Sequence, residues 1–371
     1  MSVFSVEIKK SLQLPYLALL IGMFAISTSA ILIRYSDSEP LVIGAYRQAF
    51  ATLIFLPLIL KDKAAEIRSQ SYSTIFEMIF TGILLGAHFS FFITSVKETS
   101  VAASVLLATC HVVYVAVLGW ILFGEILTRK AILGTSVSLC GILILFGGDL
   151  LDNPGNFMGN IFAFISGILA GLYYLSGRKL RKIISLPTYA FVVYLFSFIS
   201  MFIIVLVQNL NYENLPVYEL QLFLLMALIP TLLGHTMQNW AIGYLPAYIV
   251  SISLLAEPVG SGLLAWLFFN EVPSFGVILG GLIVISGLYL VILGEESNYL
   301  LSSIIFFLLF LSLSSPSIFA AISNSSPPLA FAKASLASFF FFFLIIFLIF
   351  VILYLLNKRV NKYESHNIKI F

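Results

Sequence analysis

Long apolar runs alternate with short polar breaks along most of the sequence. A helix needs about 20 apolar residues to cross the hydrocarbon core of a bilayer. Runs of about that length predict twelve membrane-spanning helices, at residues 16–33, 41–60, 75–95, 101–123, 131–147, 157–176, 188–208, 220–241, 248–269, 275–293, 300–320 and 334–356. The pattern therefore predicts an all-α polytopic membrane protein.

The composition excludes a soluble globular protein. Sixty per cent of the residues are apolar, 10% are charged and the mean hydropathy is +1.07, whereas soluble domains carry about 25% charged residues. The net charge of +2 does not suggest a nucleic-acid partner. Both cysteines, Cys110 and Cys140, lie inside apolar runs, which argues against a disulfide framework and a zinc cluster. We therefore expect the lipid bilayer as surroundings and neither a cofactor nor a metal.

The basic residues predict the orientation, because Lys and Arg accumulate in cytoplasmic loops. With a cytoplasmic N-terminus, 15 of the 19 basic residues fall in inner segments and only Arg34 and Lys97 in outer loops. An even number of helices returns the C-terminus to the cytoplasm. We read the first apolar run as a retained helix, because it is longer than the core of a signal peptide. The expected location is the plasma membrane.

An internal repeat appears when the sequence is offset by 146 residues. Residues 105–134 align with residues 251–280, and Trp120 then matches Trp266. The repeated unit contains five predicted helices, so an odd number of crossings inserts the second copy the opposite way up. Inverted repeats are typical of secondary transporters, whose substrate site lies near the midplane between the copies.

The repeat predicts how the chain is organised. The expected parts are a cytoplasmic tail, two five-helix repeats that form a ten-helix core, an extra two-helix segment and a basic cytoplasmic tail, at residues 1–15, 16–148, 157–294, 300–356 and 357–371. The extra segment resembles a truncated third repeat, because residues 317–346 are similar to residues 31–60. Two interpretations stay open for this hairpin: a duplication relic facing lipid, or a peripheral pair that regulates the core or mediates oligomerisation.

Two groups of motifs resemble a known family. SAILIRYSDSEPLVIGAYRQAFATLIFLPL at 29–58 is similar to the start of an EamA domain of the drug/metabolite transporter superfamily. WILFGE at 120–125 and WLFFNE at 266–271, each followed by a helix with regularly spaced glycines, are similar to its paired helix ends. The resemblance covers about 16–294. It implies a ten-helix carrier with cytoplasmic termini that moves small metabolites such as amino acids.

Three charged or titratable residues in predicted membrane helices are candidates for the transport site, because such residues are costly in a bilayer. We expect Arg47 to face a central cavity and to bind an anionic substrate or Glu257; the alternative is a snorkelling or structural arginine. The resemblance implies a basic residue at this position. Glu257 and His111 occupy the same position in the two copies, about 15 Å deep. They could form a proton-coupling pair or a structural one.

Four further polar residues could contribute to substrate binding. His88 and His235 form a second matched pair, and counting along their helices places His88 toward the outer side and His235 toward the inner side. Gln238 and Asn239 follow closely and could line the same passage. For all four, hydrogen bonding between packed helices is the alternative.

Other classes of protein are less consistent with the sequence. The HExxH, GxSxG and P-loop motifs are absent, which argues against an enzyme, and no filter loop or charge ring of an ion channel is visible. We therefore expect a secondary active transporter that moves amino acids or related small metabolites by alternating access, as a monomer or homodimer. Proton coupling is a hypothesis, and a non-transporting membrane sensor or scaffold is the alternative.

Overall fold

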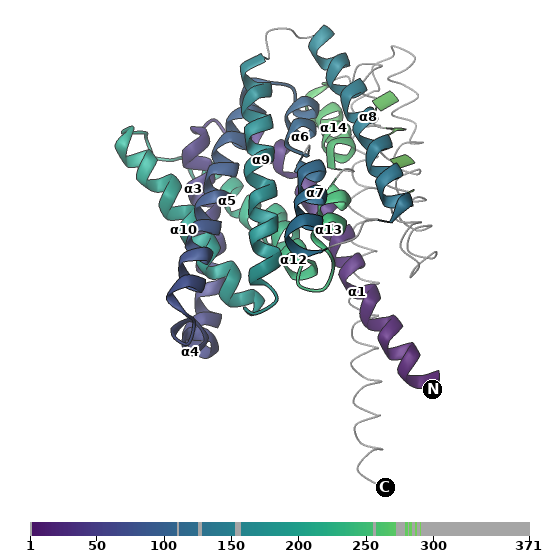
Figure 1. Ribbon diagram of the computed structural model, residues 1–371. Helices are drawn as coiled ribbons and strands as arrows, with labels where there is room; N and C mark the ends of the chain where they lie inside the picture. The colour runs from purple at the N-terminus through teal and green to yellow at the C-terminus, as the bar shows by residue number, and fades with distance from the viewer. Residues whose placement is uncertain are drawn as a thin grey trace. The chain divides into compact units, whose positions relative to one another are not determined.

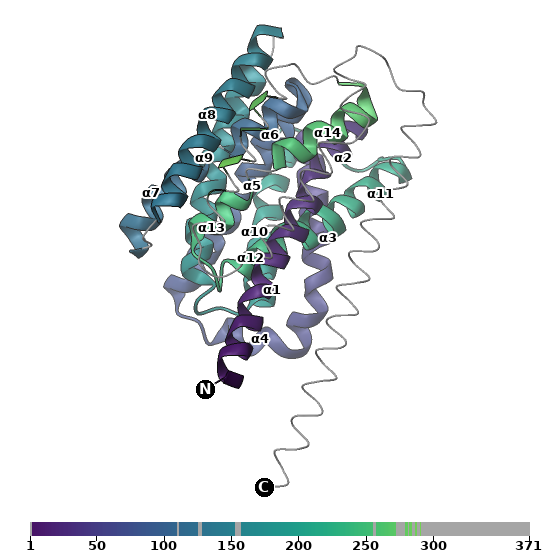
Figure 2. The same ribbon diagram turned by 90° about the vertical axis from the view of Figure 1, so that its right-hand side faces the viewer.

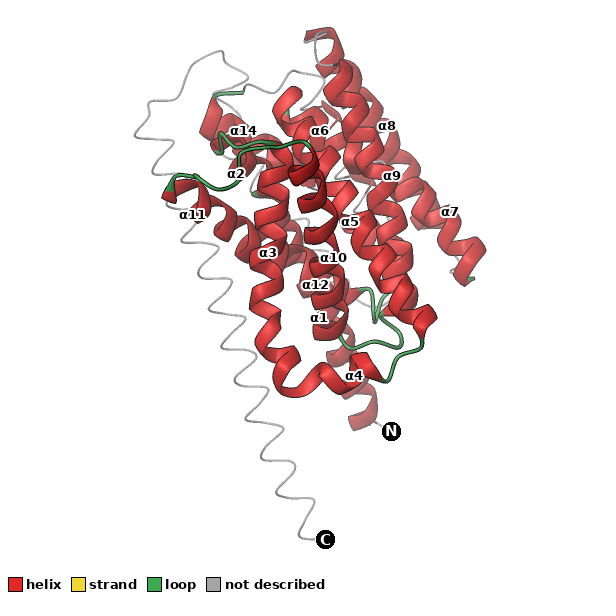
Figure 3. Ribbon diagram, turned by 90° about the vertical axis from the view of Figure 1, so that its left-hand side faces the viewer, coloured by secondary structure: helices red, strands yellow, loops and turns green. Residues whose placement is uncertain are grey.

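The computed structural model describes residues 2–109, 111–124, 128–152, 157–254 and 257–271, together with 279–280, 282–283, 286–287 and 290. The described residues form helices joined by short loops, and none of them is in a strand (Figures 1 and 3). The predicted C-terminal hairpin and most of the predicted tenth helix lie outside the described residues, as does Glu125.

The observed helices follow the order predicted from the apolar runs. Their bounds are α1 (Ser2–Ser27), α2 (Ser29–Tyr35), α3 (Pro40–Leu58), η1 (Ile59–Lys63), α4 (Ala64–Arg68), α5 (Tyr72–Glu98), α6 (Val101–Thr109), α7 (His111–Phe123), α8 (Arg129–Asp152), α9 (Phe157–Leu180), α10 (Leu186–Val207), α11 (Val217–Met226), η3 (Ala227–His235), α12 (Thr236–Ala241), α13 (Ala247–Ser253) and α14 (Glu257–Phe269). The elements η1 and η3 are π-helical.

Six segments among the described residues are long and apolar enough to cross a bilayer. They are Leu14–Tyr35, Pro40–Lys61, Tyr72–Glu98, Phe157–Leu180, Leu186–Val207 and Val217–Ala241. Large apolar side chains lie exposed on their outward faces, such as Leu60, Phe76 and Val207. Because water would disfavour so much exposed apolar surface, these faces are suited to lipid. The chain is therefore an all-α polytopic membrane protein.

Local sequence explains where several of these helices begin. Pro40 occupies the first turn of α3, where its missing N–H costs nothing and its fixed φ favours the helix. Ser71 precedes α5, and its side chain accepts a hydrogen bond from Thr74 N at 3.2 Å, which satisfies one otherwise free backbone donor.

The element bounds repeat at the same offset as the sequence. The helix α6 begins at Val101 and α13 begins at Ala247, 146 residues later; α7 ends at Phe123 and α14 ends at Phe269, also 146 residues later. The similarity between the copies therefore extends from residue types to the positions at which helices begin and end.

The residues that follow these helices also correspond. Gly124 and Asn270 both adopt a positive φ, of 66° and 53°, in the left-handed region that favours Gly and Asn after a helix. The helix α6 packs against α14, and α7 packs against α13 (Figures 1 and 2). This crosswise pairing is the arrangement expected when two copies insert in opposite directions.

Two glycines, Gly82 and Gly167, permit close contact between helices. A Cβ on Gly82 would lie 2.7 Å from Val193 O of α10, and one on Gly167 would lie 2.8 Å from Ala108 O of α6. Real Cβ atoms do not approach a carbonyl oxygen so closely, so a larger residue would force these helices apart. These glycines therefore serve packing within the bundle.

Candidate functional site

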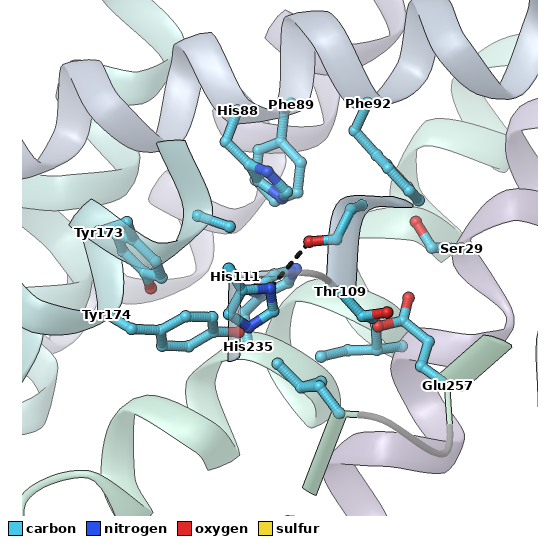
Figure 4. A pocket seen from close by; sticks show the side chains of 14 residues that line it. Ser29, His88, Phe89, Phe92, Thr109, His111, Tyr173, Tyr174, His235 and Glu257 are labelled. Carbon is cyan, nitrogen blue, oxygen red and sulfur yellow. Dashed lines mark hydrogen bonds between the residues drawn. The ribbon is translucent and has the colours of Figure 1, made fainter. Parts of the chain in front are cut away.

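A small cavity lies in the interior of the helix bundle, where the two repeats meet (Figure 4). The volume of the cavity is about 30 Å³, which is room for about two water molecules. The residues that line it are Ile26, Ser29, His88, Phe89, Phe92, Ala108, Thr109, His111, Ala170, Tyr173, Tyr174, His235, Leu254 and Glu257. The elements α1, α2, α5, α6 and α7 supply the walls from the first repeat, and α9, η3 and α14 supply those from the second.

Four of the seven residues predicted to bind substrate line this cavity: His88, His111, His235 and Glu257. Their side chains come from four different elements and are grouped around one space (Figure 4). The other three predicted residues, Arg47, Gln238 and Asn239, do not line it, and each lies one side chain further away.

His111 offers an unpartnered nitrogen at the cavity. Its Nδ1 lies 2.8 Å from Ala108 O, and because a carbonyl oxygen only accepts, Nδ1 carries the proton. In the neutral ring Nε2 is then a proton acceptor, and this atom has no hydrogen-bond partner among the described residues. The ring stacks on Tyr174 with centroids 5.5 Å apart. His111 is therefore arranged to take up a proton or to accept a hydrogen bond from a ligand.

Glu257 brings a carboxylate to the same cavity. It is the first residue of α14 and is 7% exposed. Pro258 has no N–H to donate to the carbonyl of Leu254, and Leu254 also lines the cavity. Glu257 and Arg47 attract each other electrostatically, but no salt bridge joins them in the part of the chain that the structure describes. The carboxylate is therefore free to interact with a ligand or a proton.

The expectation that His88 and His235 lie toward opposite sides of the membrane is wrong. Their rings meet edge to face, with centroids 6.3 Å apart. That expectation came from counting residues along regular α-helices. His235 instead ends the π-helical η3, whose wider turns shorten the rise per residue along the helix axis. Pro230 interrupts the hydrogen-bond ladder within η3. His88 Nδ1 is held by Ser166, with the hydroxyl at 2.8 Å and the carbonyl at 3.0 Å.

Arg47 is fully buried and held by neutral groups. Its Nε donates to Thr231 Oγ1 at 2.7 Å and its Nη1 to Ser29 Oγ at 3.0 Å. The guanidinium carbon lies 4.2 Å from the centroid of the Phe89 ring, so this phenyl ring separates the charge from the cavity. The remaining nitrogen, Nη2, has no hydrogen-bond partner in the part of the chain that the structure describes. Arg47 thus connects α3 to α2 and to η3 and supports the cavity wall formed by Phe89.

Gln238 and Asn239 lie behind two tyrosines of the cavity wall. Tyr174 OH donates to Gln238 Oε1 at 2.6 Å, and Tyr173 OH donates to Asn239 Oδ1 at 2.8 Å. Both amides belong to α12 and are buried. They orient the tyrosines that face the cavity.

The cavity does not have the geometry of a metal site. No three His, Cys, Asp or Glu side chains converge to ligate an ion in the described part of the chain. The three histidines and Glu257 instead surround a space, which suits an organic ligand with several polar atoms.

One end of the bundle is closed by a polar cluster, here called the Glu219 cluster. Glu219 is buried and accepts hydrogen bonds from Ser36 Oγ at 2.5 Å and Asp37 N at 2.7 Å. Lys97 Nζ donates to the carbonyls of Ser36 and Ser38, at 3.1 and 2.5 Å. These contacts join the loop after α2 to α5 and α11.

A salt bridge lies near the same end. Arg34 and Glu271 are 3.2 Å apart, and Arg34 Nη2 also donates to Thr99 O at 2.6 Å. The other oxygen of Glu271 accepts from Val101 N at 3.3 Å, in the first turn of α6. Glu271 therefore has the structural role expected of a carboxylate at a helix end.

The opposite end, here called the basic end, carries α4 and the loop after α9. Glu66 accepts from Ser185 N at 2.8 Å, Ser185 Oγ at 2.5 Å and Thr188 Oγ1 at 2.8 Å. Burial raises the pKa of Glu66, but these hydrogen bonds outweigh it and hold the pKa below its usual range. Lys63 lies 3.5 Å from the same carboxylate.

Arg181 lies at this basic end and is half-buried. Its Nε donates to Asn239 O at 3.0 Å, and its Nη1 donates to Ile184 O. Burial lowers the pKa of Arg181, and the nearby Tyr189 and Glu66 oppose that effect. The side chain thus links the loop after α9 to α12.

Several residues of this region were not singled out from the sequence. Phe89, Tyr173 and Tyr174 line the cavity, but single aromatic residues in an apolar run carry no signal of their own. Glu219 could have been noticed as a carboxylate at the start of a predicted helix. Its burial was not predictable, because loop residues distant in sequence cover it.

Comparisons with known proteins agree with this architecture. The EamA-like transporter family matches the chain twice, at residues 13–147 and 157–293. An uncharacterized transporter of Archaeoglobus fulgidus is 21% identical over 280 residues, which cover 74% of this chain and 95% of that protein. A WAT1-related protein of Arabidopsis thaliana is 27% identical over 301 residues, covering 68% and 82%.

A solved crystal structure shares the fold. It superposes with a TM-score of 0.57 at 20% identity and covers 74% of this chain and 96% of that one. The two family matches together span well over half of the sequence. The chain therefore belongs to the EamA-like transporter family and is a membrane transporter.

Proposed function

We propose that this transporter is a secondary carrier of small metabolites, with amino acids or related compounds as the first class to test. The observation that carries the proposal is a cavity walled by helices of both repeats, with polar contacts between elements at both ends of the bundle. Such a site can open to one side when one five-helix copy rocks against the other.

The size of the cavity supports alternating access. Room for about two waters is far less than an amino acid needs. A substrate can therefore occupy the site only after a wall moves. The Glu219 cluster and the Glu66 contacts are the groups that would separate when one end opens.

We assign direct contact with substrate to His88, His111, His235 and Glu257, because these side chains line the cavity. Arg47, Gln238 and Asn239 would act indirectly, by holding Phe89, Tyr174 and Tyr173 in place. Four of the seven residues would thus touch the substrate, and the other three would hold the aromatic side chains of the cavity wall in place.

Proton coupling is proposed for Glu257 and His111. The carboxylate of Glu257 lies at the cavity, and so does His111 Nε2, which has no hydrogen-bond partner within the described ranges. A substrate ammonium group would compete with a proton for Glu257, and this competition couples the two movements. Each transport cycle would then exchange one proton for one substrate molecule.

The orientation is also a proposal. Arg178, Lys179 and Arg181 lie at the basic end with α4, which places two predicted inner loops together. The positive-inside rule then assigns the basic end, and with it the N-terminus, to the cytoplasm of a plasma membrane.

Counterflow uptake in proteoliposomes tests the carrier. Vesicles loaded with an unlabelled compound are given a trace of the labelled one, with amino acids as the test set and nucleobases and sugars as controls. Saturable uptake of one class supports the carrier and names the substrate. Absence of uptake from protein shown to be folded would favour the sensor or scaffold.

A substitution separates coupling from transport. Glu257→Gln should lose the response to a pH gradient, because the amide cannot titrate, and counterflow should persist with a raised KM, because the amide oxygen can still accept a hydrogen bond from substrate. The matched control is Glu77→Gln, which changes a partly exposed carboxylate paired with Lys179 at 2.8 Å. An unaltered gradient response in Glu257→Gln would refute the assignment.

A further inference from the structure

Six polar side chains form a buried group between the cavity and the basic end. They are Tyr173, Tyr174, Tyr189, Tyr194, Gln238 and Asn239, here called the tyrosine–amide cluster, and each is at most 3% exposed. They come from α9, α10 and α12. So many polar groups in the interior of a membrane protein are costly unless they have a function or are fully hydrogen-bonded.

Hydrogen bonds connect four members of the cluster in two pairs, and a fifth member to Thr236. The two tyrosines of α9 donate to the two amides of α12, at 2.8 and 2.6 Å. Tyr194 OH lies 2.9 Å from Thr236 Oγ1, which in turn lies 3.1 Å from Thr231 O of η3. Hydroxyl groups both donate and accept, so such contacts can pass a proton along.

The cluster reaches both the cavity and the basic end. Tyr173 and Tyr174 line the cavity, and Tyr174 stacks on His111 (Figure 4). At the other side Arg181 Nε donates to Asn239 O at 3.0 Å. Tyr189 lies on the first turn of α10, and its hydroxyl would be 2.9 Å from a Cβ on Gly177.

Part of the hydrogen-bonding capacity of the cluster is unused. Among the residues that the structure describes, Gln238 Nε2 is buried without a hydrogen-bond partner, and so is His235 Nδ1 at the cavity. A buried donor left unsatisfied costs about 1–3 kcal/mol. Bound water commonly satisfies such groups, so the cluster has the chemistry of a hydrated site.

The corresponding positions of the first repeat are only partly polar. At the offset of 146 residues, Gln238 corresponds to Phe92, Asn239 to Ile93, and Tyr189 to Ile43. The other three members, Tyr173, Tyr174 and Tyr194, correspond to the polar residues Ser27, Thr28 and Gln48. The two amides and Tyr189 therefore have no polar counterpart in the first repeat.

We propose that the tyrosine–amide cluster, with water bound among its hydroxyls and amides, conducts protons between the basic end and the cavity. At each step one O–H bond breaks as another forms on the next oxygen, and the net result is one proton moved. Glu257 or His111 Nε2 binds the proton at the cavity. This role rests on the proton coupling proposed above.

Other titratable or charged groups face the two ends of the path. Those near the cavity are His88, His235, Glu257, His111 and Arg47, and those near the basic end are Arg178, Arg181 and Glu66. The two arginines at the basic end raise the electrostatic energy of an excess proton there. A neutral path through tyrosines and water is consistent with proton transfer by successive hops.

The double variant Tyr189→Phe/Tyr194→Phe tests the path, because it removes two hydroxyls that do not line the cavity. Uptake driven by a pH gradient should slow on the order of tenfold, while counterflow without a gradient stays close to wild type. The matched control, Tyr46→Phe, removes a hydroxyl that donates to Tyr212 O at 2.7 Å outside the cluster. Gradient-driven uptake at the wild-type rate in the double variant would overturn the proposal.

Hydroxyl-radical footprinting of the folded, full-length protein gives a second readout that needs no transport. Water within the cluster should make Tyr189 and Tyr194 react well above Phe223, a buried aromatic residue of α11. If wild-type protein transports without any response to pH, the proposed coupling fails, and labelling still decides whether the hydrated path exists. Protection equal to that of Phe223 would refute the path in either case.

Discussion

Replacing Arg47 by lysine tests whether this residue supports the cavity wall or binds substrate. Arginine holds two partners through a planar fork, whereas lysine offers a single ammonium on a flexible stem. Hydrogen bonds to a charged group contribute about 1.5–3 kcal/mol each, and a cation–π contact about 0.5–2 kcal/mol. Lysine can keep one partner of the pair Thr231 and Ser29. We therefore expect Arg47→Lys to lower the free energy of unfolding by about 2–4 kcal/mol.

Unfolding by SDS in detergent micelles, followed by far-ultraviolet circular dichroism, measures this loss. Thr231→Val removes the hydroxyl that accepts from Arg47 Nε and keeps the shape of the side chain. Because the two residues share one bond, their effects should not add in a double-mutant cycle. Arg129→Lys is the control: this arginine is exposed at the start of α8, and its replacement should change stability by less than about 0.5 kcal/mol.

The opposite pattern would refute this reasoning. If Arg47 bound a substrate carboxylate directly, Arg47→Lys would raise the KM for substrate and leave the unfolding curve unchanged. Lower stability with a small change in KM supports the role assigned to Arg47. Lower stability together with a similar loss in Thr231→Val would locate the effect in their shared hydrogen bond.

Three further substitutions probe the ends and the packing of the bundle. Glu66→Gln should weaken the contacts of the basic end by about 1.5–3 kcal/mol. In wild type the contribution of these contacts to stability is present above the ordinary carboxyl pKa of about 4 and is lost as pH falls through the lowered pKa of Glu66. Unfolding curves at several pH values would show this, and a loss of stability that does not depend on pH would contradict it. Gly167→Val should separate α9 from α6, because the added Cβ would approach Ala108 O too closely. Thermal unfolding of the purified variant should therefore begin at a lower temperature than that of wild type. Equal unfolding temperatures would count against the observed packing. Glu271→Gln should lower the free energy of unfolding by at most about 1 kcal/mol, since the salt bridge with Arg34 is partly exposed. A larger loss in denaturant unfolding would show that this salt bridge contributes more than its exposure suggests.

The periodicity and length of the apolar runs were sufficient to predict the membrane helices that the structure describes. Those predictions succeed because a helix must satisfy its backbone within the bilayer, so length and hydropathy alone decide whether it spans. The resemblance to EamA domains, carried by the motifs at 29–58, 120–125 and 266–271, is confirmed by the family matches. The offset of 146 residues reappears in the helix bounds for the same reason, since similar sequences begin and end helices alike.

The contents of the site were only partly predictable. Glu257 and His111 were identified because a titratable residue in an apolar run is rare, and rarity is visible in a sequence. Phe89 and Tyr174 were missed because aromatic residues are common in such runs, and nothing local tells a cavity wall from a lipid-facing residue. For Arg47 the sequence predicted burial in the membrane but favoured an anionic substrate or a carboxylate as partner, whereas the structure supplies two hydroxyls and a phenyl ring.

Local hydropathy and the similarity between segments are sufficient to identify this chain as a helical membrane protein built from a repeated unit. Which polar groups meet depends on how the helices pack in three dimensions. Counting residues gives an approximate depth along a regular helix, but the direction in which a side chain points depends on how neighbouring helices pack and on the π-helical turns of η3. That is why His88 and His235 meet at one cavity, and why Gln238 and Asn239 lie behind it rather than in its wall.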